Sequence, residues 1–131
     1  MKYLFDTSVW LWSLAAPEEI GQEGVELLAR GTEEFYLSAA SSWEMTIKSA
    51  LGKLRLPEPA VSYVPKRMAA QGVRSLPITH RHALAVSELP AYHRDPFDRL
   101  LIAQAQAEGM AILTSDRAFR LYRVEIVWCG R

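Results

Sequence analysis

The sequence has little cysteine, no long apolar run and no excess of charge of either sign. A single cysteine, Cys129, excludes an internal disulfide, and no Cys/His spacing typical of a zinc site occurs. No apolar stretch approaches the ~20 residues of a membrane span, and the N-terminal apolar residues meet Asp6 too soon for a signal peptide. We therefore expect a cytoplasmic protein with no membrane association.

The charges balance over the whole chain but not along it. Fifteen basic residues match fifteen acidic ones, which excludes a histone-like coat for nucleic acid, because such binding depends on neutralising many phosphates. Residues 18–34 carry six acids and one base, whereas residues 45–75 carry six bases and one acid. This segregation predicts a basic face on a neutral protein.

Short apolar segments alternate with helical patterns throughout the chain. The length of 131 residues, half of them apolar, predicts a single domain spanning residues 1–131 with its own core. We expect strands near residues 3–5, 34–37, 73–78, 110–113 and 124–128. Helices are expected near residues 9–14, 24–29, 42–51, 61–70, 79–89 and 97–108, the third of them capped by Ser41 or Ser42. The alternation predicts an α/β fold with a central parallel sheet of four to five strands and helices on both faces.

Acidic residues follow these elements at positions where chemistry is expected. Ligand sites of such sheets lie beyond the carboxyl ends of the strands, and Asp6 and Asp116 each follow a strand within three residues. Asp98 stands in the first turn of a helix that opens with Asp95-Pro96, and Glu44 lies near the start of another helix. Taken singly, each is equally explained by helix capping or by a solvated surface, and Asp95 is the natural N-cap of its helix.

Together, the acids indicate a metal site. The topology brings Asp6, Glu44, Asp98 and Asp116 to one end of the sheet, where carboxylates raise one another's pKa unless a cation relieves the repulsion. Oxygen-only ligands favour Mg²⁺ or Mn²⁺, and we expect Asp6, Asp98 and Asp116 to bind the ion for phosphoryl chemistry. Hydroxyl side chains beside the acids are expected to support the site: Thr7, Ser8, Thr114 and Ser115.

These motifs resemble those of the PIN-domain nucleases, and the chain length fits the VapC-type toxins of bacterial toxin–antitoxin pairs. The resemblance runs from Tyr3 to Trp128; its most specific part spans Asp95 to Ala105. It implies a three-layer α/β/α fold and Mg²⁺- or Mn²⁺-dependent endoribonuclease activity that leaves a 5′ phosphate and a 3′ hydroxyl. It also implies a homodimer, a small antitoxin partner, and a catalytic acidic quartet formed by Asp6, Glu44, Asp98 and Asp116.

Other polar and aromatic residues have weaker signals. Lys48, Lys53 and Arg55 follow Glu44 in the chain and are our candidates for contacts with the RNA backbone. None of the three histidines is expected to act in catalysis. His80 and His82 are two residues apart and would face different sides of a helix, and an oxygen-rich site rarely needs the imidazole of His93, which lies near the acidic motif. The helix that carries Trp10 and Trp12 is apolar nearly all round, which favours packing in the core or against a partner protein.

Two other functions stay open at this point. A PIN-like domain without activity could retain the fold for dimerisation or partner binding. An aspartyl-phosphate phosphatase could use Asp6 as its nucleophile, although that chemistry would need a second acid two residues later, where Ser8 stands.

Overall fold

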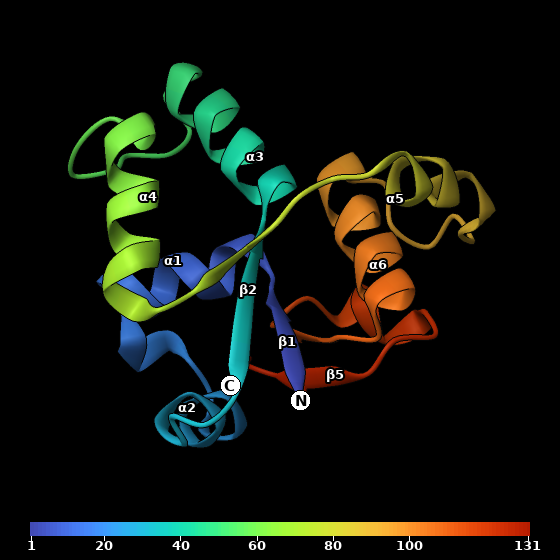
Figure 1. The fold of residues 1–131 in the computed structure, drawn as a ribbon, viewed down its shortest axis with the longest axis horizontal. Coiled ribbons are helices and arrows are strands. Elements are labelled where there is room, and N and C mark those ends of the chain that lie inside the picture. Colours follow the sequence, from blue (N-terminus) through green and yellow to red (C-terminus); the bar gives the residue numbers. More distant parts are fainter.

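Five parallel strands form one sheet in the computed structural model, which describes residues 1–131. The strands are β1 (Lys2–Phe5), β2 (Glu34–Ser38), β3 (Arg74–Leu76), β4 (Ala111–Thr114) and β5 (Ile126–Trp128). Their order across the sheet is β3-β2-β1-β4-β5, and all four pairings are parallel. The five expected strands and the parallel sheet are therefore confirmed, with β1 at the centre (Figure 1).

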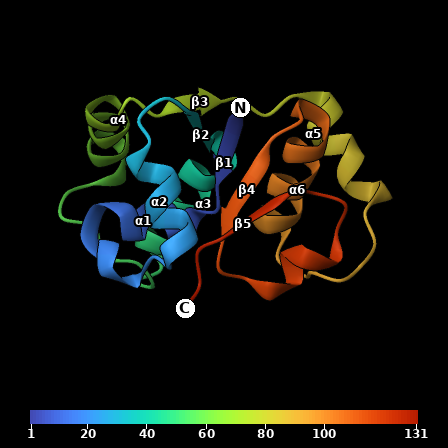
Figure 2. The ribbon, with the colours of Figure 1, turned by 90° about the horizontal axis from the view of Figure 1, so that it is seen from below.

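The helices cover both faces of this sheet. They are α1 (Thr7–Ala15), α2 (Gln22–Ala29), α3 (Ala39–Ala50), α4 (Ala60–Gln71), α5 (His80–Ala85) and α6 (Pro96–Glu108), with three short 3₁₀ helices, Pro17–Glu19, Val86–Glu88 and Arg117–Leu121. Figure 2 shows α1, α2 and α4 on one side of the sheet and α5 and α6 on the other. This is the expected three-layer α/β/α arrangement. No helix combines the length and apolarity needed to cross a membrane.

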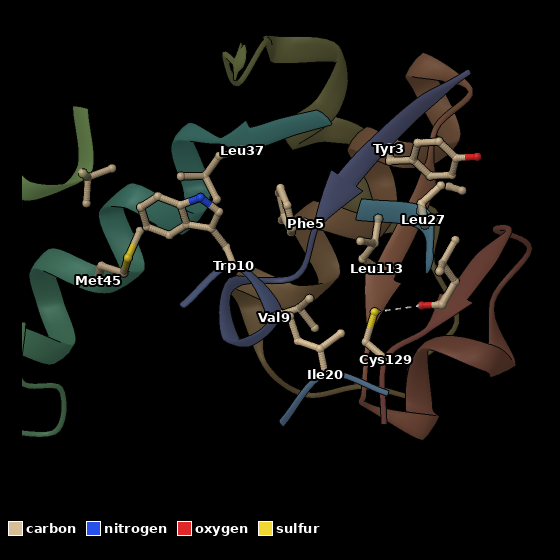
Figure 3. Packing of buried hydrophobic residues seen from close by; sticks show 13 residues of the cluster. Tyr3, Phe5, Val9, Trp10, Ile20, Leu27, Leu37, Met45, Leu113 and Cys129 are labelled. Carbon is tan, nitrogen blue, oxygen red and sulfur yellow. Dashed lines mark hydrogen bonds between the residues drawn. The ribbon is translucent and has the colours of Figure 1, made fainter. Parts of the chain in front are cut away.

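The alternation of side chains along the strands produces two separate cores. In β1, Tyr3 and Phe5 belong to the cluster under α1 and α2, whereas Leu4 between them belongs to the cluster under α6. Trp10, the largest fully buried side chain, lies in the first cluster (Figure 3). Of the two environments expected for the apolar N-terminal helix, Trp10 therefore occupies the core, where its indole N–H donates to Gln71 Oε1 at 2.8 Å.

Helix α6 begins and ends as its sequence predicts. One carboxylate oxygen of Asp95 accepts hydrogen bonds from the backbone N–H groups of Phe97 (2.8 Å) and Asp98 (3.2 Å), and Pro96 is the first helical residue. Gly109 ends the helix with a left-handed φ of 66°, a conformation that costs glycine little. The capping role of Asp95 is thus confirmed, and it fixes the side chain of Asp98 in the first turn.

Two helix boundaries differ from expectation. Helix α3 is capped by Ser38, whose Oγ accepts from the Ala40 backbone N–H at 3.0 Å, and not by Ser41 or Ser42. The cap is earlier because β2 runs directly into the helix without a loop. The helix expected over residues 79–89 ends at Ala85 and continues as a 3₁₀ turn.

Candidate functional site

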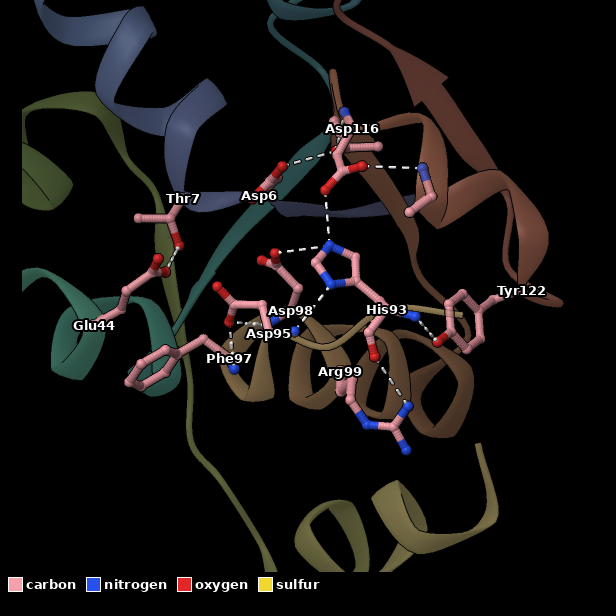
Figure 4. A network of polar contacts seen from close by, with 12 residues as sticks. Asp6, Thr7, Glu44, His93, Asp95, Phe97, Asp98, Arg99, Asp116 and Tyr122 are labelled. Atoms are coloured by element: carbon pink, nitrogen blue, oxygen red, sulfur yellow. Dashed lines mark hydrogen bonds and ion pairs between the residues drawn. The ribbon is translucent and has the colours of Figure 1, made fainter. Parts of the chain in front are cut away.

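The carboxyl ends of β1 and β4 lie side by side and bring distant parts of the chain together. Phe5 pairs with Leu113, and the backbone N–H of Asp6 donates to the Leu113 carbonyl at 2.9 Å. The start of α6 approaches the same edge, so Asp6, Asp98 and Asp116 converge as predicted (Figure 4). Each comes from a different element, and only the sheet topology unites them.

Asp6 occupies the N-cap position of α1, yet its side chain makes no capping hydrogen bond. It is 7% exposed and accepts a hydrogen bond of 2.7 Å from the hydroxyl of Thr114. That hydroxyl accepts in turn from the Asp116 backbone N–H at 3.0 Å, so its own proton is directed to Asp6. Burial, with help from the charges of Glu44 and Asp116, raises the pKa of Asp6 to about 6. Helix capping therefore does not explain this residue.

Asp98 has the more strongly shifted pKa. Burial is the largest cause and the neighbouring carboxylates add to it, Asp6 first, raising the pKa of Asp98 to about 8. The two carboxylate oxygens of Asp116 have different partners. Oδ1 caps the 3₁₀ helix that follows by accepting from the Ala118 N–H at 2.9 Å, and Oδ2 faces His93. The three aspartates supply oxygen ligands only, and their repulsion would be relieved by a hard divalent cation. The donor set therefore fits Mg²⁺ or Mn²⁺.

Glu44 forms a second, adjoining unit on α3. Its carboxylate is buried and accepts from the Thr7 hydroxyl at 2.8 Å and from the Lys48 ammonium at 2.5 Å. The hydrogen bond with Glu44 is the main reason that the pKa of Lys48 is raised. Glu44 makes no hydrogen bond with the aspartates, and its charge acts on Asp6 and Asp98 at longer range. The negative charge of Glu44 is largely balanced by Lys48, one helical turn later in α3.

His93 is the site residue that sequence reasoning missed. Its Nε2 lies 2.7 Å from Asp116 Oδ2 and 3.1 Å from Asp98 Oδ2, and the ring is only 14% exposed (Figure 4). One side-chain nitrogen or oxygen atom from each of these three residues lies within 4.8 Å of the other two. His93 stands in an irregular loop, where no periodicity predicts direction. The one available signal was its position two residues before the helix cap Asp95.

The remaining predicted residues divide between those that touch the acids and those that do not. Thr7 and Thr114 hydrogen-bond to Glu44 and Asp6, as expected of supporting residues. Ser8 is exposed on α1 and makes no side-chain hydrogen bond with the acids, so its supporting role stays a prediction. Ser115 makes no side-chain hydrogen bond. Lys53 and Arg55 are exposed in the loop after α3, beyond the helix end that lies away from the sheet (Figure 1).

The chain is similar in sequence to two ribonucleases of Mycobacterium tuberculosis. Ribonuclease VapC22 is 28% identical over 121 residues, which cover 92% of this chain and 91% of that protein. Ribonuclease VapC16 is 54% identical over 46 residues, a match that spans 35% of this chain and 33% of that protein.

Solved structures share the fold over nearly the whole chain. VapBC2 from Rickettsia felis, bound to a promoter DNA fragment, has a TM-score of 0.73 at 15% identity and covers 99% of this chain and 100% of its own. DNA-bound VapBC from Salmonella typhimurium has a TM-score of 0.71 at 16% identity, with 96% of each chain covered. The family model described as "PIN domain" matches residues 3–125. With the three-layer fold and this acidic edge, the chain belongs to the PIN-domain family.

Proposed function

We propose that the protein is a metal-dependent endoribonuclease and the toxin of a toxin–antitoxin pair. The observation that carries the proposal is the convergence of Asp6, Asp98 and Asp116, with pKa values of about 6 and 8 for the first two, at the carboxyl edge of the sheet. Strongly shifted acids in such a position are typical of functional sites. The ribonuclease names of the two relatives support RNA as the substrate.

The three aspartates would hold Mg²⁺ or Mn²⁺, which supplies activation of water and neutralisation of charge on the phosphate. Thr114 keeps the Asp6 carboxylate pointing into the site through its 2.7 Å hydrogen bond. Thr7 does the same for the buried carboxylate of Glu44. The chain therefore contributes fixed oxygen atoms, each oriented by a hydroxyl group.

Contacts with the RNA backbone are proposed for the basic residues of α3 and the loop after it. Lys48 is the best placed, because its ammonium is bound to Glu44 and the charges of Asp95 and Asp98 help to raise its pKa. Lys53 and Arg55 are further along and exposed, and they would contact phosphates away from the cleaved bond. This division predicts that Lys48 affects turnover, whereas Lys53 and Arg55 affect binding.

A small antitoxin is the proposed protein partner, because the similar structures are VapBC complexes. An open cavity of about 690 Å³ lies between α1, α2 and the end of α4. Apolar side chains of α2, Val25 and Leu28, help to line it, and Val25 is 43% exposed. We propose that an apolar segment of the antitoxin occupies this cavity. Val25→Asp should abolish co-purification with the product of a small neighbouring reading frame, and unchanged co-purification would contradict this placement.

Cleavage of a mixed RNA pool tests the activity itself. We expect cleavage with Mg²⁺ or Mn²⁺, none with EDTA, and none with Asp6→Asn even when the metal is present. Glu19→Gln, which changes an exposed acid outside the site, is the matched control and should cleave like the wild type. Wild-type cleavage by Asp6→Asn would show that this acid is not part of the site. Absence of cleavage in every metal would favour a partner-binding domain without activity.

A further inference from the structure

We propose that His93 is a positioning residue of the metal site: its Nε2–H holds the carboxylates of Asp98 and Asp116 in place, and it is not itself a metal ligand. This inference rests on the proposed function, because it concerns the same acidic site. It starts from the two contacts of one ring nitrogen, 2.7 Å to Asp116 Oδ2 and 3.1 Å to Asp98 Oδ2.

The other ring nitrogen decides which tautomer is present. Nδ1 of His93 lies 3.1 Å from the backbone nitrogen of Asp95, which carries a hydrogen and can only donate. Nδ1 must therefore accept, so the ring proton of a neutral imidazole resides on Nε2. That proton points between Oδ2 of Asp116 and Oδ2 of Asp98, both of which are acceptors when the two carboxyl groups are ionised, as they must be to bind a cation. The hydrogen-bond pattern is complete only when Nε2 donates.

A direct bond from Nε2 to a metal ion would break this pattern. A ligating nitrogen must offer its lone pair, which in a neutral ring places the proton on Nδ1. That proton would then face the Asp95 N–H at 3.1 Å, and two donors would oppose each other. The backbone N–H of Asp95 cannot be reoriented, because the side chain of the same residue caps α6. Coordination by His93 is thus opposed by the start of the helix that carries Asp98.

The surroundings of His93 also prevent the ring from leaving. Its backbone N–H donates to the Tyr122 hydroxyl at 2.8 Å, and its carbonyl accepts from the Arg99 guanidinium at 3.3 Å. The ring meets the Phe119 ring edge to face, with centroids 5.6 Å apart. Arg99 also donates to the carbonyls of Val86, Leu89 and Pro90, and so holds the whole preceding loop. His93 is fixed from both sides, as expected of a group that orients its neighbours.

Binding of Mn²⁺ tests the inference without reliance on activity. The dissociation constant of Mn²⁺ is measured for the wild type, His93→Ala, His93→Gln and Asp98→Asn, with the exposed His80→Ala as matched control. Loss of residues that orient metal ligands typically weakens metal binding 10–100-fold, and we expect a loss of about this size for His93→Ala. His93→Gln places an amide N–H near the position of Nε2 and should recover most of the affinity. His80→Ala should bind like the wild type.

Electron spin-echo spectroscopy of Mn²⁺ bound to the wild type supplies a second readout that needs no variant. Absence of coupling to a directly coordinated ¹⁴N nucleus is the expected result. A coordinated nitrogen would overturn the inference, as would wild-type affinity in His93→Ala or an equal loss in His93→Gln and His93→Ala. If Asp98→Asn alone leaves Mn²⁺ binding unchanged, the metal site itself is wrong. The failure of the proposed function is thereby distinguished from the failure of the inference.

Discussion

Asp98 is buried beside four acidic residues, and each of them raises the pKa of its carboxyl group: Asp6, Asp95, Glu44 and Asp116. The carboxyl group of Asp98 has a pKa of about 8, far above the ordinary 3.8. Each unit of such a shift corresponds to about 1.4 kcal/mol of difference between the charged and the neutral form. The free energy of the folded protein therefore rises when the Asp98 carboxyl group ionises without a counter-ion.

We predict that Asp98→Asn stabilises the protein in EDTA. The neutral amide keeps the shape of the side chain and removes the charge, so the free energy of unfolding at pH 8 should rise by at least about 1 kcal/mol. Urea denaturation measures this change. The exposed-acid variant Glu19→Gln should alter the stability by less than about 0.5 kcal/mol. Equal stability of Asp98→Asn and the wild type would mean that the site does not repel charge.

The response to pH and metal follows from the same two aspartates. The folded pKa values of Asp6 and Asp98, about 6 and 8, exceed the unfolded value of 3.8. Between the unfolded and the folded pKa values, the folded state holds protons that the unfolded state has lost. The contribution of these two carboxyl groups to the free energy of unfolding is therefore complete below about pH 4. It is lost as the pH rises through about 6 and then 8.

Bound Mn²⁺ should reverse this trend, because the cation favours the ionised carboxylates. We predict that millimolar Mn²⁺ raises the melting temperature at pH 8, and that the rise shrinks as the pH falls to 5, where protons displace the ion. The double variant Asp6→Asn/Asp98→Asn should show no rise. Thermal scans of both proteins in Mn²⁺ and EDTA make the comparison. Equal shifts in the two proteins would place the cation elsewhere.

Among the elements, α6 is attached to the sheet by a buried polar side chain as well as by its apolar face. Gln104 is fully buried; its Oε1 accepts from the Ser38 hydroxyl at 2.5 Å, and its Nε2 donates to the Pro77 carbonyl at 3.3 Å. One residue thereby joins the ends of β2 and β3 to the helix that carries Asp98. Such a group is costly to remove because its partners remain buried.

We predict that Gln104→Leu lowers the free energy of unfolding by about 1–3 kcal/mol, because leucine leaves the proton of the Ser38 hydroxyl and the Pro77 carbonyl without a partner. Gln106→Leu, two residues later on the exposed side of α6, should change it by less than about 0.5 kcal/mol. Chemical denaturation of both variants measures the difference. Similar values for the two would mean that apolar packing alone holds α6.

Secondary structure and the edge position of the acids could be predicted, because both follow from local patterns and from the rule for parallel sheets. Asp6 directly follows β1, Asp116 follows β4 after one residue, and the Asp95-Pro96 cap determines where Asp98 lies. The position of His93 beside the acids could not be predicted, since it depends on how the loop is held by Arg99 and Tyr122.

The predicted basic face was only partly informative. Lys48, Lys66 and Arg74 form ion pairs with Glu44, Glu58 and Glu34 respectively. These acids come partly from outside the basic segment, so a count along the chain could not anticipate the pairing. The net positive charge left on this face is therefore smaller than the count along the sequence suggests, and only the pair of Arg74 with Glu34 depends on residues distant in sequence.

For the whole molecule, we predict a homodimer. Large apolar side chains are more than half exposed at Trp43, Leu84 and Leu121, which lie on three different elements, and a second copy of the chain could cover such apolar surface. Light scattering at micromolar concentration should give twice the chain mass of 14.8 kDa. Adding Mn²⁺ or EDTA should not change the mass, because these residues are not metal ligands. A mass of one chain would contradict the prediction.

The central position of β1 has a consequence for the protein during its own synthesis. Asp6 is made first, but its partner Thr114 is 108 residues away in the sequence, and β1 has no neighbour on that side until β4 exists. At the usual 5–20 residues per second, the ribosome adds the remaining acids on the order of ten seconds later. A nascent chain that stops before Asp116 therefore lacks the complete acidic site. Under the proposed function, the growing chain could not cleave the RNA around its own ribosome until translation is nearly complete.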